Sequence, residues 1–447
     1  MTFEDFKNEL FAEAKDKGFS DYELYYSAGT GFSVRVFKGE IAEYKNSSTE
    51  GVGFRGTFEG KPGYAYSEKL ASGIIAELLD NAAANAGIIE EKNPEKLYPG
   101  DDAYPEVSCF NPALDDVDTA KKIDMALALD KYVTELDPRI IMADYCTIST
   151  EESRVALANS YGLNLSGIRN KASAFVIARA NENGITKSGY DFWQGRDFAD
   201  FDYKALGKKV VDIATSYLGA KSVPTGDYAI VFNNKTAISL FGTFSNIFLA
   251  EHGQKGFSML NKEKLGEAIA APIVTIRDDG VTDLSLESAA FDAEGVATQN
   301  KAVIENGMLS TLLYNTKSAA KDGVKSTGNA SKAGFGGAIK SSISNFYLVP
   351  GEKSFDELIA DTGSGLLITE LQGLHSGANT VSGDFSFSAD GFLIEDGKIS
   401  RPVEQITVAG NFYDMIKNIT AIGNDLRFQQ TVGMPSIAVT GLKTAGL

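Results

Sequence analysis

The sequence predicts an α+β protein, with an N-terminal antiparallel sheet and flanking helices followed by a large curved, mostly antiparallel sheet or incomplete barrel. Apolar residues alternate with polar ones over many short segments, which is the period of a half-buried strand. Asp396-Gly397 and Asn306-Gly307 each separate two apolar segments, and such dipeptides favour the positive φ angles of a tight hairpin turn. Helical spacing is confined to fewer segments, so strands dominate the C-terminal half.

Residues 1–222 are expected to form a first domain. Helical spacing over 3–17 is followed by turn-separated strands, and Ser67 is suited to cap a helix over 68–86. After a charged connector at 88–117, helices are predicted over 118–136 and 199–218. The expected strands are 22–27, 31–37, 41–44, 51–58, 63–66, 139–149, 154–159, 163–168, 172–180 and 186–193. Both groups of strands have flanking helices, a pattern compatible with a single intertwined layer.

A boundary is predicted at 221–226, which contains Pro224 and Gly226, so residues 223–447 are expected to form the second domain. Its helices are predicted over 234–249, 354–361 and 411–419. The expected strands are 227–232, 273–276, 302–305, 308–314, 345–348, 366–371, 384–388, 391–394, 398–403, 407–408 and 437–439.

Composition limits the classes of partner. The chain has 447 residues and a formal net charge of −18, and it has no basic cluster longer than a pair. Such a chain repels nucleic-acid phosphates, so no nucleic-acid partner is expected. Cys109 and Cys146 are the only cysteines, which favours a reducing compartment. No secretory signal or membrane-spanning stretch is recognised, and the expected location is the cytoplasm.

One long stretch identifies a family. Residues 373–403 read GLHSGANTVSGDFSFSADGFLIEDGKISRPV. This stretch closely resembles the C-terminal signature of the TldD/PmbA family, formerly called modulators of DNA gyrase. Further agreement comes from EGVGFRGTFEGKPGYAYS at 50–67, KGFSMLNKEKLGEAIA at 255–270 and STGNASKAGFGG at 326–337 with SNFYLVPG at 344–351. The resemblance covers nearly the whole chain, and it does not imply DNA binding for so acidic a protein.

The resemblance implies a zinc-dependent peptidase complex of two homologous subunits. Its catalytic subunits carry His-Glu-x-x-x-His on a helix, with a later cysteine as a further zinc ligand. Counting back from Lys255-Gly256 places the motif positions at Phe241, Gly242 and Asn246, none of which is a metal ligand or general base of that motif. The C-terminal end also lacks the cysteine. This chain therefore resembles the PmbA (TldE) branch, the partner subunit without a metal site.

The resemblance also implies the partners. We expect a heterodimer with a TldD-like catalytic paralogue that holds the zinc, no cofactor in this chain, and small or unfolded peptides as substrates. Alone, the chain is expected to form a homodimer, since closed symmetric assemblies are the usual outcome. No catalytic residue is assigned to this chain.

Two other functions stay open. His252 and His375, the only histidines, could contribute to a divergent metal site of a stand-alone homodimeric metallopeptidase, or the chain could be a peptide-binding scaffold without catalysis. In a purely structural interpretation, His252 interacts with a helix C-terminus and His375 is a hydrogen-bonding loop residue.

Two loops are candidate borders of a peptide groove, because an extended peptide can pair with an exposed strand edge. The first, at 373–383, offers His375, Ser376, Asn379 and Ser382. The second, at 326–343, is rich in small residues and is equally compatible with a mobile surface loop.

Overall fold

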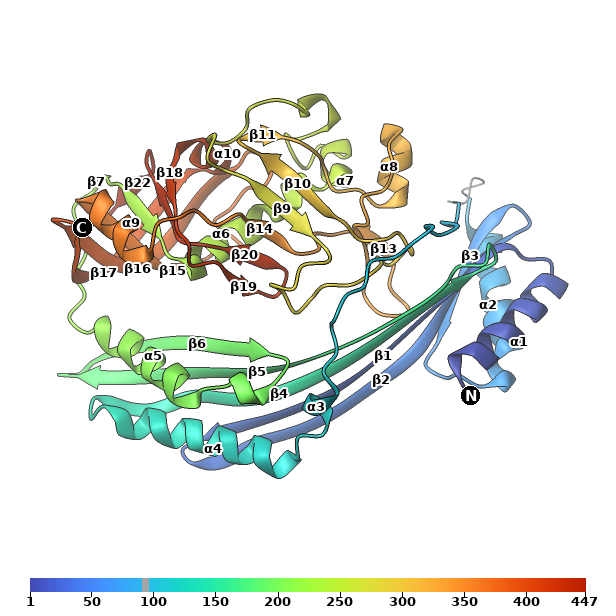
Figure 1. Ribbon diagram of the computed structural model, residues 1–447, viewed down its shortest axis with the longest axis horizontal. Coiled ribbons are helices and arrows are strands. Elements are labelled where there is room, and N and C mark those ends of the chain that lie inside the picture. Colours follow the sequence, from blue (N-terminus) through green and yellow to red (C-terminus); the bar gives the residue numbers. More distant parts are fainter. Residues whose placement is uncertain (91–95) are drawn as a thin grey trace.

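The computed structural model describes residues 1–90 and 96–447. Its first half is built on one six-stranded antiparallel sheet that crosses the whole molecule as a long curved layer (Figure 1). The order is β3-β2-β1-β4-β5-β6, with all neighbours antiparallel. The bounds are β1 Ser20–Phe37, β2 Glu40–Phe58, β3 Lys61–Ser67, β4 Ile140–Asn159, β5 Asn164–Glu182 and β6 Ile185–Gly195. The two predicted groups of strands thus form a single layer.

The strands are longer than predicted. The predicted interruptions of β1 at 28–30 and of β2 at 45–50 are both wrong. Gly29 pairs with Thr49 and Gly31 with Ser47 in an unbroken ladder. Runs of glycine, serine and threonine resemble loops because their side chains are small and polar, but here they continue the strand. β3 pairs only with Val52–Phe58 of β2, so among the described residues 40–51 have no strand neighbour on that side.

Helices cover only the convex face of this sheet. Even-numbered residues of β1, such as Leu24, Val34 and Val36, are buried among apolar side chains of the helices. Odd-numbered residues, such as Ser27, Gly29 and Ser33, point to the concave face, as the two-residue period of a strand requires. The covering helices are α1 Phe3–Asp16, α2 Ile75–Ile88, α4 Thr119–Leu136 and α5 Tyr203–Ser216, with one short turn, α3 Pro112–Asp115, before α4.

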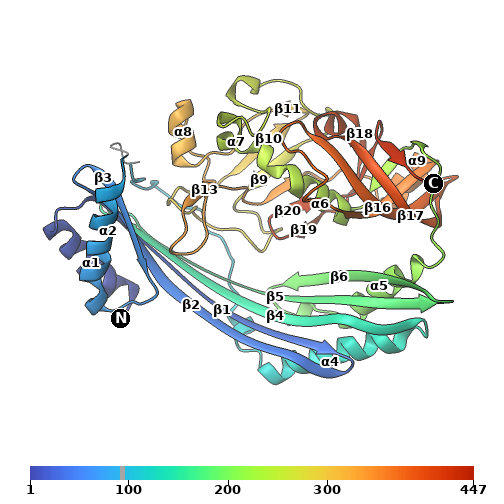
Figure 2. The same cartoon turned by 180° about the vertical axis from the view of Figure 1, so that it is seen from behind.

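The C-terminal half lies over the concave face, as the view from behind also shows (Figure 2). It contains an eight-stranded sheet of order β18-β21-β8-β15-β16-β17-β22-β7 and a six-stranded sheet of order β11-β10-β9-β14-β20-β19. The first curls around α6 Asn234–Phe244, and one large apolar core joins it to the second. This arrangement confirms the predicted α+β class with a curled C-terminal sheet.

The bounds of this half are as follows. The larger sheet contains β7 Gly226–Asp227, β8 Ile230–Phe232, β15 Gly365–Gln372, β16 Asp384–Glu395, β17 Lys398–Asn411, β18 Ile419–Ile422, β21 Ile437–Val439 and β22 Lys443–Ala445. The smaller contains β9 Ile276–Asp279, β10 Asn300–Glu305, β11 Met308–Leu309, β14 Phe346–Leu348, β19 Arg427–Gln429 and β20 Val432–Met434. A hairpin, β12 Ala330–Lys332 with β13 Ile339–Ser341, stands apart, and the remaining helices are α7 Ala250–Gln254, α8 Thr316–Asp322, α9 Phe355–Thr362 and α10 Phe412–Met415.

Several helix and strand boundaries differ from the predicted ones. The helix expected over 68–86 begins at Ile75, after a 3-10 turn at Ser72–Ile74. The helix expected over 234–249 ends at Phe244 and continues as a 3-10 turn, Ser245–Phe248. Only two residues of the expected strand 308–314 pair in β11. No helix in the described ranges is long and apolar enough to cross a membrane.

Candidate functional site

The segment that corresponds to the metal motif is part of the hydrophobic core. Phe241 and Gly242 lie in α6, and Asn246 lies in the 3-10 turn that follows. The Phe241 ring is fully buried against Phe412, with centroids 5.3 Å apart, and Phe244 stacks on the same ring at 4.5 Å. Asn246 is exposed. An apolar ring, a glycine and an exposed amide occupy the three positions.

These residues do not fit a zinc ion. Zinc sites are built from imidazole, thiolate and carboxylate groups, and the three positions supply none of them. Across residues 1–90 and 96–447, no three His, Cys, Asp or Glu side chains gather so that they could hold a metal ion. We therefore assign no metal chemistry to this segment.

The two histidines are on different elements. His252 lies in the last turn of the five-residue helix α7, where its ring meets Phe257 edge to face at 6.1 Å, and burial lowers its pKa. His375 is exposed on the loop between β15 and β16. Neither residue lines the cavities described below, and the proposal of a divergent metal site gains no ligand set from the structure.

The loop 373–383 is ordered by its own polar groups. Oδ1 of Asn379 accepts the backbone N–H groups of Val381 (3.0 Å) and Ser382 (3.2 Å). Asn411, at the end of β17, donates to the Ser382 carbonyl oxygen at 2.8 Å. Of the four predicted groove residues, Asn379 and Ser382 thus hold the loop in shape. Ser376 also donates to the Gly373 carbonyl oxygen at 3.3 Å, and His375 is exposed.

A different region has the features of a binding site. Three cavities of about 740, 690 and 640 Å³ lie along the concave face of the first sheet, where loops of the C-terminal half approach it. We call them the sheet–loop cleft. The residues of the C-terminal half that line it are Leu286, 288–293, Lys317, 330–332 and 335–339. The first half contributes residues of β1 to β5, of α2 and of the connector at 107–110. Sequence reasoning did not predict this cleft.

Two glycines of β2 let the β12–β13 hairpin touch the sheet. Phe335, at the tip of the hairpin, lies directly over Gly51 and Gly53. A Cβ atom at Gly53 would be 2.1 Å from the Phe335 carbonyl oxygen, and one at Gly51 would be 2.5 Å from its ring. The ring also approaches Tyr66 of β3, with centroids 6.1 Å apart. Residues of the hairpin line both the 690 Å³ and the 640 Å³ cavities.

Buried charges surround this contact. Arg55 donates two hydrogen bonds to Glu23, at 2.9 and 3.0 Å, and Glu23 is only 1% exposed. The amine of Lys332 lies 4.4 Å from the ring centroid of Tyr25. Burial lowers the pKa of Lys332 to about 8, although Glu23 attracts its proton, and burial raises the pKa of Tyr25 to about 12.

Two buried carboxyl groups fix the loops on the other side. The backbone N–H groups of Glu294 (2.8 Å) and Val296 (3.0 Å) donate to one oxygen of Asp292, and that of Ala330 donates to the other at 2.9 Å. Burial and repulsion by Glu294 raise the pKa of Asp292 to about 7. Glu294 accepts from the Thr316 N–H at 2.8 Å, and burial raises its pKa too.

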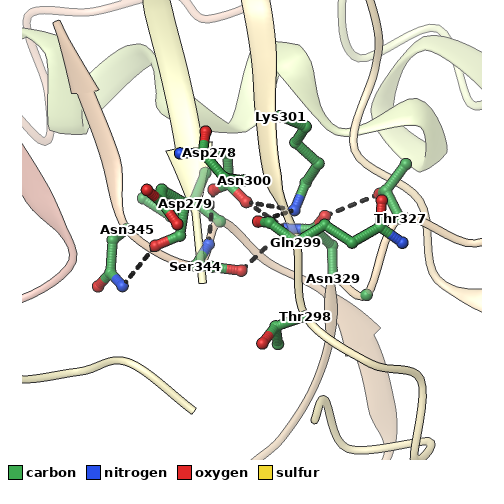
Figure 3. Close-up of polar contacts among 12 residues, drawn as sticks. Asp278, Asp279, Thr298, Gln299, Asn300, Lys301, Thr327, Asn329, Ser344 and Asn345 are labelled. Carbon is green, nitrogen blue, oxygen red and sulfur yellow. Dashed lines mark hydrogen bonds and ion pairs between the residues drawn. The ribbon is translucent and has the colours of Figure 1, made fainter. Parts of the chain in front are cut away.

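A polar network holds the segment 327–345 against β9 (Figure 3). Asp278 is fully buried and pairs with Lys301 at 2.9 Å. Its two oxygens also accept from Asn329 Nδ2 (3.0 Å) and from the Ser344 N–H (2.7 Å). The Asn345 amide donates to the Asp279 carbonyl oxygen at 2.8 Å. The loop predicted at 326–343 is therefore anchored at both ends.

Comparison with known proteins identifies the family. Models described as the PmbA/TldA metallopeptidase domain 1, central domain and C-terminal domain match residues 22–86, 112–218 and 225–446. The chain belongs to the PmbA/TldD metallopeptidase family. It is 29% identical to the metalloprotease PmbA of Escherichia coli O157:H7 over 433 residues, which cover 95% of this chain and 92% of that protein.

Solved structures agree with the fold. A Thermotoga maritima protein described as a modulator of a DNA gyrase has 32% identity and a TM-score of 0.92, covering 99% of this chain and all of that one. TldE of Thermococcus kodakarensis has 22% identity and a TM-score of 0.91, with the same coverage, and shows the fold alone.

Proposed function

We propose that this chain is the non-catalytic subunit of a TldD/TldE-type metallopeptidase complex that degrades or processes small or unfolded peptides. The observation that carries the proposal is the α6 segment, where Phe241 fills the core at a motif position and the other two positions hold Gly242 and Asn246. The zinc and the general base would come from a TldD-like paralogue. In that pair this chain would supply walls of the peptide chamber and stabilise its partner.

The packing around α6 supports the proposal against a hidden metal site. A histidine at position 241 would have to place its imidazole between Phe412 and the buried side chains around it. Burying a polar ring without hydrogen-bond partners costs about 1–3 kcal/mol in proteins, so this helix is adapted to packing. In the absence of the partner, we propose that the chain forms a homodimer.

Mixing with the zinc-bearing paralogue of the same genome tests the proposal. Light scattering would follow complex size while cleavage of an unstructured peptide is measured in the same samples. We expect a mixed complex whose activity neither chain shows alone. Equal peptide cleavage by the paralogue with and without this chain would refute the partner role.

Metal analysis tests the alternative that the chain is itself an enzyme. Purified wild type, His252→Ala and His375→Ala would be dialysed against zinc and assayed for bound metal. We expect less than stoichiometric zinc in all three. Stoichiometric zinc that is lost in either variant, together with cleavage by the wild type alone, would instead establish a divergent site.

A further inference from the structure

The 640 Å³ cavity of the sheet–loop cleft has two chemically different sides. Its volume is in the range of small-molecule sites. The apolar side is formed by Phe110, Val155 and Phe291. The polar side contains the cations of Arg169 and Lys332. A ligand that matches both sides has an apolar group beside an anionic one.

Lys332 is the cation of this lining for which the described residues provide no ion-pair partner. Glu23, the carboxylate that attracts it most, already accepts both hydrogen bonds from Arg55. Within the described ranges, no carboxylate forms an ion pair with the Lys332 amine, whose recorded contact is the face of Tyr25. A poorly hydrated ammonium ion without a counter-charge is costly, and an anion in the cavity would offset that cost.

The other charges around the cavity are already paired. Arg169 is half-exposed, donates to the Ser153 hydroxyl at 2.9 Å and forms an ion pair with Glu287 at 3.1 Å. Glu287 also forms an ion pair with Lys171 at 2.6 Å. Asp292 is the one carboxylate of the lining, but both of its oxygens already accept backbone N–H groups. The single unbalanced charge that faces the cavity is therefore positive.

We propose that this cavity binds a carboxylate attached to an apolar group, with the Lys332 amine as its counter-ion and Phe291 and its apolar neighbours around the rest. The carboxylate can be the C-terminus of a short peptide or belong to a free amphipathic acid. The site is formed by one chain, so it does not depend on a catalytic partner. Binding would give this chain its own contact with peptide ends, separate from the chemistry of bond cleavage.

Titration calorimetry on the whole chain tests this site directly. The probes are the tetrapeptide Ala-Ala-Ala-Phe as the free acid, the same peptide as the C-terminal amide, and acetyl-phenylalanine. We expect the acid to bind at least about tenfold more tightly than the amide, which is a usual effect of one charge-assisted hydrogen bond. Acetyl-phenylalanine that binds as well as the tetrapeptide acid would identify free acids as ligands, and weaker binding would identify peptide ends.

A matched pair of variants separates the site from general charge. Lys332→Gln should reduce affinity for the acid to that for the amide, while Lys340→Gln, an exposed lysine on the other strand of the same hairpin, should leave it unchanged. Lys332→Gln removes a buried charge and should fold, which circular dichroism would check. Equal affinities for acid and amide, no binding of any probe, or wild-type affinity in Lys332→Gln would each overturn the proposal.

The pH dependence gives a second readout. The Lys332 pKa of about 8 means that affinity for the acid should fall between pH 7 and 9 as the ammonium loses its proton. The pKa of Tyr25, about 12, lies outside this range, and burial raises the pKa of Cys109. Asp292, with a pKa of about 7, would also weaken binding as it ionises, but that effect would persist in Lys332→Gln. A profile that is identical in both proteins would contradict the assignment.

Discussion

The Glu23–Arg55 pair allows a quantitative test of how the sheet–loop cleft is held together. Arg55→Met would leave the Glu23 carboxylate buried, at 1% exposure, without either of its two hydrogen bonds from the guanidinium. Breaking a buried pair on one side typically costs about 3–5 kcal/mol, because the remaining charge is uncompensated. For a cooperative unit of 150–250 residues this corresponds to a fall in Tm of roughly 6–20 °C.

A double variant distinguishes the pair from simple loss of packing. Glu23→Met/Arg55→Met replaces both charges with apolar chains of similar length, and such replacements are often neutral or stabilising. We therefore expect the double variant to regain most of the stability that Arg55→Met loses. Lys443→Met, which breaks the exposed pair with Asp227, is the control and should change the free energy of unfolding by less than about 1 kcal/mol.

Urea unfolding followed by fluorescence and by circular dichroism would give the free energies of all four proteins. A loss of less than about 1 kcal/mol in Arg55→Met would refute this prediction, since a buried carboxylate that loses its hydrogen-bonded partner cannot cost so little. It is also refuted if the double variant is as unstable as the single one, because the damage would then come from packing.

Three further predictions concern other parts of the chain. In urea titrations, Phe241→Ala should lower the free energy of unfolding by about 3–5 kcal/mol, as for other buried phenylalanines. Asn246→Ala, at an exposed position, should change it by less than about 0.5 kcal/mol. Gly53→Ala should displace the β12–β13 hairpin and accelerate its cleavage by trypsin. Gly73→Ala, which has open space around the new Cβ atom, should not change the cleavage rate. Equal cleavage rates in the two variants would disprove the contact. Lys332→Met should stabilise the protein at pH 7. Because the folded-state pKa of the lysine is about 8 and its ordinary value is 10.5, the unfolded wild type holds more protons above pH 8, so wild-type stability rises with pH there. The difference in the free energy of unfolding between Lys332→Met and wild type should thus decrease by about 2 kcal/mol from pH 7 to 9.5. A difference that does not change with pH would contradict the buried-ammonium assignment.

Local signals predicted much of the fold. The turn at Asp396-Gly397 joins β16 to β17, and that at Asn306-Gly307 joins β10 to β11, because both depend on the φ preferences of adjacent residues. The continuity of β1 through Gly29 and Gly31 could not be predicted in this way. Whether a polar, small-residue run is a loop or the middle of a strand depends on the neighbouring strands that pair with it.

The sheet–loop cleft was missed for a related reason. Glu23, Arg55 and Lys332 come from three distant parts of the chain, and no spacing in the sequence connects them. A weak signal was present in Arg55, a charged residue inside the otherwise small and apolar strand GVGFRGTF. By contrast, the expected positions of the metal motif could be located from sequence, because that motif is a local pattern on one helix.

The short length of β3 leaves an edge along which molecules of this protein could associate at high concentration. Residues 40–51 of β2 present a row of unpaired backbone groups at the border of the sheet, a template on which other chains could polymerise. Four charged residues lie along this edge: Glu40, Glu43, Lys45 and Glu50. Resistance to fibril growth along this border thus depends on four surface residues, and the three glutamates of one molecule would repel those of a second.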